Sequence, residues 1–219
     1  MTQIMKKGEW LELTIPIEWD GLTPVQLFQD IWKAPKKQTH FFRMNKEMLV
    51  NGHTNYWMNA LKKGDRFQLK LYKEEAYGVL PAYIDLDVLY EDELLLVVNK
   101  PAGIDTHPNH PGQDNTLANG VAFHLQTKGE QYPVKHIHRL DRDTSGTILF
   151  AKNSFVGAIL DKMLEERKIK RTYIAIVQGI VTKKKGTINA PIGRDRHHPT
   201  RRRVSPNGQK AVTHFEVVE

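Results

Sequence analysis

The run of apolar residues from Leu94 to Val98 is the feature that most constrains the fold of this chain. An uninterrupted run of this length is typical of a strand that is buried on both faces. The Lys-Pro-Ala-Gly sequence at residues 100–103 must leave the strand, because proline cannot continue a β-ladder. Thr147–Ala151 is a second run of this kind, so we expect a buried sheet in the second half of the chain.

Strands outnumber helices in the rest of the sequence and do not alternate with them regularly. This order predicts an α+β fold with a mixed, largely antiparallel sheet. Apolar alternation and turn residues predict strands at residues 11–15, 48–53, 67–72, 88–90, 94–99, 147–151, 173–178, 186–188 and 211–218. Helical spacing predicts helices at residues 25–32, 39–48, 116–125 and 154–167.

Several local signals support these elements. Thr23 followed by proline is a helix start, and Thr116 and Ser154 stand at the cap positions of later helices. Asn51 and Gly52 predict a tight turn, since these two residue types tolerate a positive φ. A second turn is expected at residues 63–65.

The first part of the chain, residues 1–76, is predicted to be a small α+β domain. Two short helices, a Val-Asn-Gly turn and a Lys-Gly-Asp strand resemble the S4-like RNA-binding module over about 35 residues. Its basic residues are few: Lys36, Lys37, Arg43 and Lys46. A small domain without RNA contact is the alternative. Residues 77–86 are predicted to be a linker, and residues 87–219 a second domain.

Composition excludes several classes of protein. The chain has no cysteine, which rules out disulfides, thiolate metal sites and cysteine nucleophiles. We expect no membrane span, because the apolar runs are far shorter than the roughly 20 residues a span needs. No secretory signal is evident at the N-terminus. These features are typical of a cytoplasmic protein.

The positive charge is concentrated in one segment. Between residues 183 and 203 there are eight basic residues and one acid, which equals the formal net charge of +7 of the whole chain. A block this dense predicts contact with phosphates of a polyanion, and a solvated basic loop is the alternative. The basic residues are Lys183, Lys184, Lys185, Arg194, Arg196, Arg201, Arg202 and Arg203.

The segment with the most reactive side chains is residues 136–146, directly before a predicted buried strand. It holds two histidines, two arginines, two acids, two hydroxyl groups and a glycine. Asp141 lies near Arg139 and Arg142, and nearby positive charge favours an ionised carboxylate. Such a carboxylate can act as a nucleophile or a general base.

Three interpretations of this segment remain open from the residues alone. The first is a carboxylate-centred enzyme that acts on a polyanion. The second is a metal site formed by His136, His138 and Asp141, since a His-x-His pair on a strand points both rings to one side. The third is a structural turn in which the acids pair with the arginines.

The sequence His-Arg-Leu-Asp at 138–141, followed by Thr-Ser-Gly at 144–146, resembles the signature loop of the RluA-like pseudouridine synthases, the large-ribosomal and transfer-RNA class. Further segments resemble the same family, from about Val88 to the C-terminus. They are residues 90–93, 98–103, 107–108, 115–117, 170–175, 191–194 and 210–214.

The resemblance implies an enzyme that isomerises uridine to pseudouridine in ribosomal or transfer RNA, acting as a monomer without metal or redox cofactor. It implies that Asp141 is the catalytic aspartate, acting at C1′ or taking a proton from C2′. It also implies that Tyr173 packs on the target base. Arg139 is expected to bind phosphate or fill the gap left by an extruded base.

The family also carries a Gly-Arg-Thr-His-Gln-Ile-Arg-like motif whose basic residue pairs with the catalytic aspartate. Residues 1–219 contain no such motif. We therefore expect this sequence to be part of a longer polypeptide. The alternative is an RNA-binding protein with a catalytically impaired synthase fold.

Overall fold

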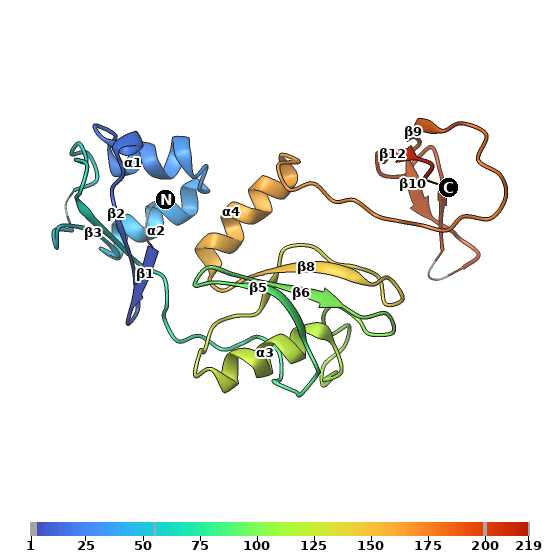
Figure 1. Cartoon of the computed structure of the whole chain (residues 1–219), viewed down its shortest axis with the longest axis horizontal. Coiled ribbons are helices and arrows are strands. Elements are labelled where there is room, and N and C mark those ends of the chain that lie inside the picture. The colour runs from blue at the N-terminus through green and yellow to red at the C-terminus, as the bar shows by residue number, and fades with distance from the viewer. Residues whose placement is uncertain (1–3, 55, 199–200, 219) are drawn as a thin grey trace. The chain divides into compact units, whose positions relative to one another are not determined.

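A computed structural model describes residues 4–54, 56–198 and 201–218. The chain forms two compact units, Met1–Arg171 and Thr172–Glu219 (Figure 1). Every strand pairing among these residues is antiparallel, so the sheets are more uniform than the predicted mixed sheet. The α+β class and the small N-terminal domain are confirmed.

The first sheet belongs to the N-terminal region and has the strand order β1-β2-β4-β3. The Asn51-Gly52 turn is confirmed, with φ angles of 51° and 86°. The first strand of this sheet was not predicted. It runs from Ile4 to Lys7 and pairs antiparallel with residues Trp10 to Leu13. The strands are β1 (Ile4–Lys7), β2 (Trp10–Thr14), β3 (Met48–Val50) and β4 (Arg66–Lys70).

The helices of this region follow a short 3-10 turn at Ile17–Trp19. Helix α1 (Pro24–Gln26) continues as the π-helical turn η2 (Leu27–Ile31), and the Thr23 hydroxyl accepts a hydrogen bond from the Gln26 N–H. Helix α2 spans Lys36–Met44, so the predicted range of 39–48 was wrong at both ends. The helix cannot continue to residue 48, because Lys46 has a φ of 55° and turns the chain into β3.

The second sheet carries the candidate site and has the order β5-β6-β8-β7. Its centre is formed by the two apolar runs found in the sequence, paired from Leu95 opposite Ala151 to Lys100 opposite Gly146. The strands are β5 (Asp87–Glu91), β6 (Leu95–Lys100), β7 (Lys135–His136) and β8 (Gly146–Ala151).

Helices α3 (Leu117–Thr127) and α4 (Ser154–Glu165) cover opposite faces of this sheet (Figure 1). Leu96 and Val98 of β6 pack in one core with residues of α3. Ala151 of β8 packs in another core with residues of α4. Both faces of the central strands are therefore covered, as the apolar runs predict.

The cap of α4 differs from the prediction. Asn153 is the cap: its backbone is extended, and its Oδ1 accepts a hydrogen bond of 2.8 Å from the N–H of Val156. Ser154 was the wrong choice, because it is already the first helical residue. The predicted cap of α3 is confirmed, since Thr116 and Asn119 form a reciprocal capping box.

An aromatic cluster joins the N-terminal helices to α4. The ring of Phe155, in the first turn of α4, lies 5.4 Å from that of Phe28 and 5.1 Å from that of Phe42, measured between centroids. Trp32 and Trp57 complete the cluster around Phe28. The N-terminal region and α4 thus share one hydrophobic core.

Residues 77–86 pack closely against α3. Asn119 Nδ2 donates a hydrogen bond of 2.8 Å to the Leu80 carbonyl, and the Asn119 carbonyl accepts one of 3.2 Å from the Ala82 N–H. A Cβ at Gly120 would lie 2.9 Å from the Cβ of Ile84, so the contact requires glycine in the middle of this helix. The predicted linker is ordered, and the domain boundaries on its two sides stay a prediction.

The second unit contains two antiparallel strand pairs, β9 with β12 and β10 with β11. No strand forms at residues 173–178, so that prediction was wrong. A strand requires a hydrogen-bonded neighbour, and no described residue pairs with this segment. The strands are β9 (Lys185–Asn189), β10 (Ile192–Arg194), β11 (Arg202–Val204) and β12 (Val212–Glu216).

Among the helices that the structure describes, none has both the length and the apolar character needed to cross a lipid bilayer.

Candidate active site

The segment with the reactive side chains forms a loop between β7 and β8. The N–H of Thr144 donates a hydrogen bond of 3.1 Å to the Asp141 carbonyl, so the chain turns directly after Asp141. Gly146 enters β8 with a φ of 128°, a conformation that favours glycine. The loop is thus held at both ends by strands of the buried sheet.

Asp141 lies at the exposed tip of this loop. Within the described parts of the chain, its carboxylate takes part in no hydrogen bond or ion pair, and the same holds for Asp143. The pairs between these acids and Arg139 or Arg142, which the structural-turn interpretation requires, are therefore absent from the described contacts. The carboxylate of Asp141 is open to a ligand.

Lys100 holds the backbone of the loop through hydrogen bonds. Its side chain is fully buried at the end of β6, and its Nζ donates hydrogen bonds of 2.8 to 2.9 Å to the carbonyls of Pro101, Ile104 and Arg142. Burial lowers the pKa of Lys100, whereas the nearby carboxylates, including Asp141, act to raise it. Sequence reasoning missed this residue as part of the site.

Thr106 fixes the loop on the other side of Asp141. Its buried hydroxyl donates a hydrogen bond of 2.9 Å to the Leu140 carbonyl and accepts one of 3.2 Å from the Leu140 N–H. The Leu140 side chain is itself buried in the core beneath α3. The residues before and after Asp141 are therefore both tied to the segment that follows β6.

Three histidines, His107, His136 and His138, lie in or next to this loop. The rings of His107 and His136 are stacked, with centroids 4.6 Å apart and planes 13° from parallel. Burial lowers the pKa of both rings, and the positive charge of Arg139 lowers them further. Burial also lowers the pKa of His138, whose Nδ1 has no hydrogen-bond partner in the described structure. These effects favour neutral imidazoles.

The metal-site interpretation receives no support from this geometry. Within residues 4–54, 56–198 and 201–218, no three histidine, aspartate or glutamate side chains are grouped so that they could hold a metal ion. His136 stacks on His107 and does not converge with His138 and Asp141.

The two arginines of the loop are placed differently. Arg139 is exposed, and its guanidinium makes no hydrogen bond or ion pair to any described residue. Arg142 is also exposed, but its Nε donates a hydrogen bond of 3.1 Å to the Gly103 carbonyl. Arg139 is therefore the arginine that is free to bind a ligand beside Asp141.

The other predicted site residues belong to the second unit. Tyr173 is 56% exposed. All eight basic residues of the 183–203 segment are exposed. Arg194 lies directly opposite Arg202 in the β10–β11 pair, while Lys185 forms an ion pair of 2.7 Å with Glu216 on β12. The exposed arginines and lysines are therefore available to solvent and ligands.

Comparison with known sequences assigns the chain to a family. Residues 94–219 match the family described as RNA pseudouridylate synthase, which is more than half of the chain. The chain belongs to the RNA pseudouridylate synthase family. Residues 11–67 match the RluD ribosomal pseudouridine synthase N-terminal domain. The family resemblance stated from the sequence is confirmed, and pseudouridine synthases are isomerases.

Individual relatives agree with this assignment. The RNA pseudouridine synthase YhcT of Bacillus subtilis is 50% identical over 213 residues, 97% of this chain and 70% of that protein. The ribosomal large subunit pseudouridine synthase D of Pseudomonas aeruginosa is 39% identical over 148 residues, 67% of this chain but only 46% of that protein. The chain therefore spans part of the length of each of these relatives.

A solved structure supports the fold. The human RNA pseudouridylate synthase domain containing 1 superposes with a TM-score of 0.51 at 22% identity, over 64% of this chain and 55% of the human one. A likeness at this level of identity concerns the fold alone.

Proposed function

We propose that this chain provides the catalytic loop of an RNA pseudouridine synthase that isomerises uridines in ribosomal or transfer RNA, with Asp141 as the catalytic residue. The observation that carries the proposal is the exposed, unpaired carboxylate of Asp141 on a loop held from both sides by Lys100 and Thr106. Preorganised groups of this kind accelerate reactions because they need no rearrangement when the substrate arrives.

The reaction needs a carboxylate anion that is held close to the ribose of the target uridine. The Asp141 carboxylate either attacks C1′ or removes a proton from C2′, and in both routes the bond between N1 and C1′ breaks. The freed uracil rotates, and C5 forms a bond to C1′. In the first route this bond displaces the Asp141 carboxylate from C1′, and in the second route Asp141 returns the proton to C2′. The proton leaves C5 and N1 gains one, so the product is an isomer of the substrate. No oxidant, reductant or second substrate is consumed.

Access to the uridine requires that its base leaves the stack, which costs a few kcal/mol. We propose that the exposed basic residues of the 183–203 segment offset this cost by binding phosphates. The register of β10 and β11 supports this role, because Arg194 and Arg202 share one face of the hairpin and repel each other unless an anion lies between them. Lys185 contributes less, since Glu216 neutralises it.

The remaining roles follow from exposure and position. We propose that Arg139, which is free beside Asp141, binds phosphate or fills the place of the extruded base. Tyr173 is proposed to pack against the target base. The N-terminal domain is proposed to bind RNA with Lys36, Lys37 and Arg43 of α2 and with Lys46 directly after it. The enzyme is proposed to act in the cytoplasm as a monomer.

The test is release of tritium from C5 of uridine in ribosomal and transfer RNA. Asp141→Asn should abolish release, whereas thermal stability and RNA affinity should stay the same, because the carboxylate has no described partner. Asp143→Asn is the matched control, since it removes an exposed carboxylate from the same loop. Release unaffected by Asp141→Asn would overturn the assignment of the catalytic residue.

A catalytically impaired RNA-binding protein is the second candidate. It predicts tight RNA binding with no tritium release, both from the 219-residue chain and from any longer native form. The two candidates are separated by measuring binding and release with the same RNA.

A further inference from the structure

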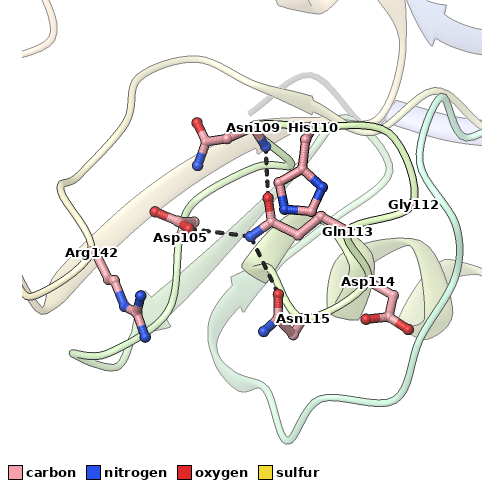
Figure 2. Close-up of a pocket in the computed structure, with 8 residues that line it drawn as sticks. All are labelled: Asp105, Asn109, His110, Gly112, Gln113, Asp114, Asn115 and Arg142. Carbon is pink, nitrogen blue, oxygen red and sulfur yellow. Dashed lines mark hydrogen bonds between the residues drawn. The ribbon is translucent and has the colours of Figure 1, made fainter.

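A polar cavity of about 470 Å³ lies beside the catalytic loop (Figure 2). It is bounded by residues 105–115 on one side and by Arg142 on the other. Its volume falls within the range of small-molecule pockets, roughly 300 to 1,000 Å³. The mechanism proposed above makes no use of this cavity.

The wall of the cavity is organised around Gln113 (Figure 2). Its Oε1 accepts a hydrogen bond of 2.7 Å from the Asn109 N–H. Its Nε2 donates to Asp105 Oδ2 at 3.2 Å and to Asn115 Oδ1 at 3.3 Å. The Gln113 side chain thus connects the two ends and the middle of the segment formed by residues 105–115. The cavity is a preformed feature of the protein, which lowers the entropy cost of binding a ligand there.

The cavity is also fixed relative to Asp141. Thr106, next to Asp105, is hydrogen bonded to the backbone of Leu140 on one side of Asp141. Arg142, on the other side, donates to the Gly103 carbonyl and lines the cavity with its side chain. Because Arg142 directly follows Asp141 and belongs to the cavity wall, the cavity lies within reach of a nucleotide next to a uridine bound at Asp141.

The charges around the cavity favour a base over a phosphate. Two carboxylates, Asp105 and Asp114, and one guanidinium, that of Arg142, line the cavity. The carboxylate of Asp114, the Oδ1 of Asp105 and the side-chain amide of Asn109 have no partner among the residues that the structure describes. Carboxylates accept hydrogen bonds from exocyclic amino groups, as aspartate and glutamate do with cytosine N4. His110 adds an imidazole on which a base can stack.

We propose that this cavity binds the base of a nucleotide adjacent to the target uridine and selects a base with an exocyclic amino group over uracil. The proposal rests on the function proposed above. Adenine, cytosine and guanine each present an amino group, whereas uracil presents only carbonyl oxygens and a ring N–H. The two carboxylates would repel those carbonyl oxygens. The cavity therefore adds a sequence preference to a protein whose other contacts are mainly to phosphates.

The test uses a pool of short single-stranded RNAs with a fixed uridine and randomised nucleotides on both sides. The RNA bound by the chain is sequenced, and pseudouridine in the same pool is mapped separately. We expect one position beside the uridine to disfavour uracil by about tenfold, the discrimination typical of one good base contact. Asp105→Asn/Asp114→Asn should reduce this preference to about twofold or less, because each change replaces an acceptor with a group that can also donate to uracil.

Gln126→Ala is the control, since Gln126 is an exposed amide on α3 away from the cavity, and it should keep the preference. The same flanking preference in the wild-type chain and in the double aspartate variant would overturn the proposal, as would the absence of any preference in the wild type. Base preference in the bound RNA without pseudouridine in any RNA would support the cavity assignment and count against the proposed catalysis. Unfolding of each variant in urea confirms that the variants are folded.

Discussion

The Nζ of Lys100 donates a hydrogen bond of 2.9 Å to the carbonyl oxygen of Arg142, the residue after Asp141. A fully buried ammonium group at the end of β6 thus holds the backbone of a residue 42 positions later, in the loop after β7. Hydrogen bonds that involve a charged group are about twice as strong as neutral ones, so this contact is a strong positional constraint on Asp141.

Replacing Lys100 with methionine should loosen the catalytic loop. The variant fills a similar volume but leaves the carbonyls of Pro101, Ile104 and Arg142 without their donor, which costs about 1 to 3 kcal/mol for each buried group left unsatisfied. We expect the rate of tritium release to fall by about 100-fold, the loss typical of a displaced catalytic group. RNA affinity should change little, since Lys100 is not exposed. Single-turnover kinetics and fluorescence anisotropy separate the two quantities.

Lys63→Met provides the control for this experiment, because Lys63 is an exposed lysine in a turn of the N-terminal region. It should leave the rate, the affinity and the unfolding free energy unchanged. Equal losses of RNA affinity and rate in Lys100→Met would count against a positioning role.

The ion network around Glu91 should make stability depend on acid pH. Burial acts to raise the pKa of Glu91, but hydrogen bonds from Lys128, Lys152 and His124 outweigh it and lower the pKa to about 2. The folded pKa lies below the usual value of 4.5, so the stabilisation is fully present above pH 4.5 and is lost as the pH falls toward 2. Glu91→Gln should cost about 3 kcal/mol at neutral pH, since it leaves Lys152 buried with one partner fewer.

Urea unfolding of the wild type and of Glu91→Gln across this pH range measures the effect. The difference in unfolding free energy between the two proteins should shrink as the pH falls. A difference that stays constant from neutral pH to about pH 3 would show that the carboxylate charge contributes nothing.

The opposed arginines of the β10–β11 pair should respond to salt. Arg194→Gln/Arg202→Gln removes two phosphate contacts, and each contact contributes about 0.7 to 0.9 to the slope of log affinity against log salt. We expect the slope to fall by about 1.4 to 1.8. Filter binding at several salt concentrations measures the slope, and Arg167→Gln controls for loss of an exposed charge elsewhere. An unchanged slope would mean that this hairpin does not contact RNA.

The unfolding free energy of the double variant distinguishes a loss of RNA contacts from a loss of hairpin structure. Like charges directly opposite each other destabilise a strand pair, so the double variant should be at least as stable as the wild type when no RNA is present. Weaker RNA binding together with lower stability would favour a structural role for the two arginines.

The cap of α4 allows a comparison between neighbouring residues. Asn153→Ala removes the side-chain acceptor for the Val156 N–H and should cost about 1 kcal/mol. Ser154→Ala changes an exposed residue that is already helical, and should alter stability by less than about 0.5 kcal/mol. Thermal unfolding of both variants gives the comparison, and a larger loss for Ser154→Ala would contradict the assigned cap.

Much of the fold could be predicted from the sequence because the signals are local. The apolar runs identify β6 and β8 through burial alone, and Asn51-Gly52 identifies a turn through its backbone preference. The reactive loop was found because many polar residues stand directly before a buried strand.

The errors arose where distant partners decide the outcome. The role of Lys100 could not be predicted, because its hydrogen-bond partners are backbone carbonyls, and a sequence pattern of side chains does not indicate such contacts. Residues 173–178 alternate like a strand, but alternation does not supply a neighbouring strand. Asn153 and Ser154 are both good caps, and only the backbone conformation distinguishes them.

The aromatic contact between Phe155 and the N-terminal helices has a consequence for the choice of target. Phe155 follows β8, and β8 follows the loop of Asp141, so the N-terminal region is packed onto the same framework that carries the carboxylate. If the N-terminal helices bind an RNA element as proposed above, this shared core fixes the distance between that element and a uridine at Asp141. We then expect the enzyme to select its target by this distance, so that a uridine with suitable neighbours but a different spacing from the RNA element is not modified.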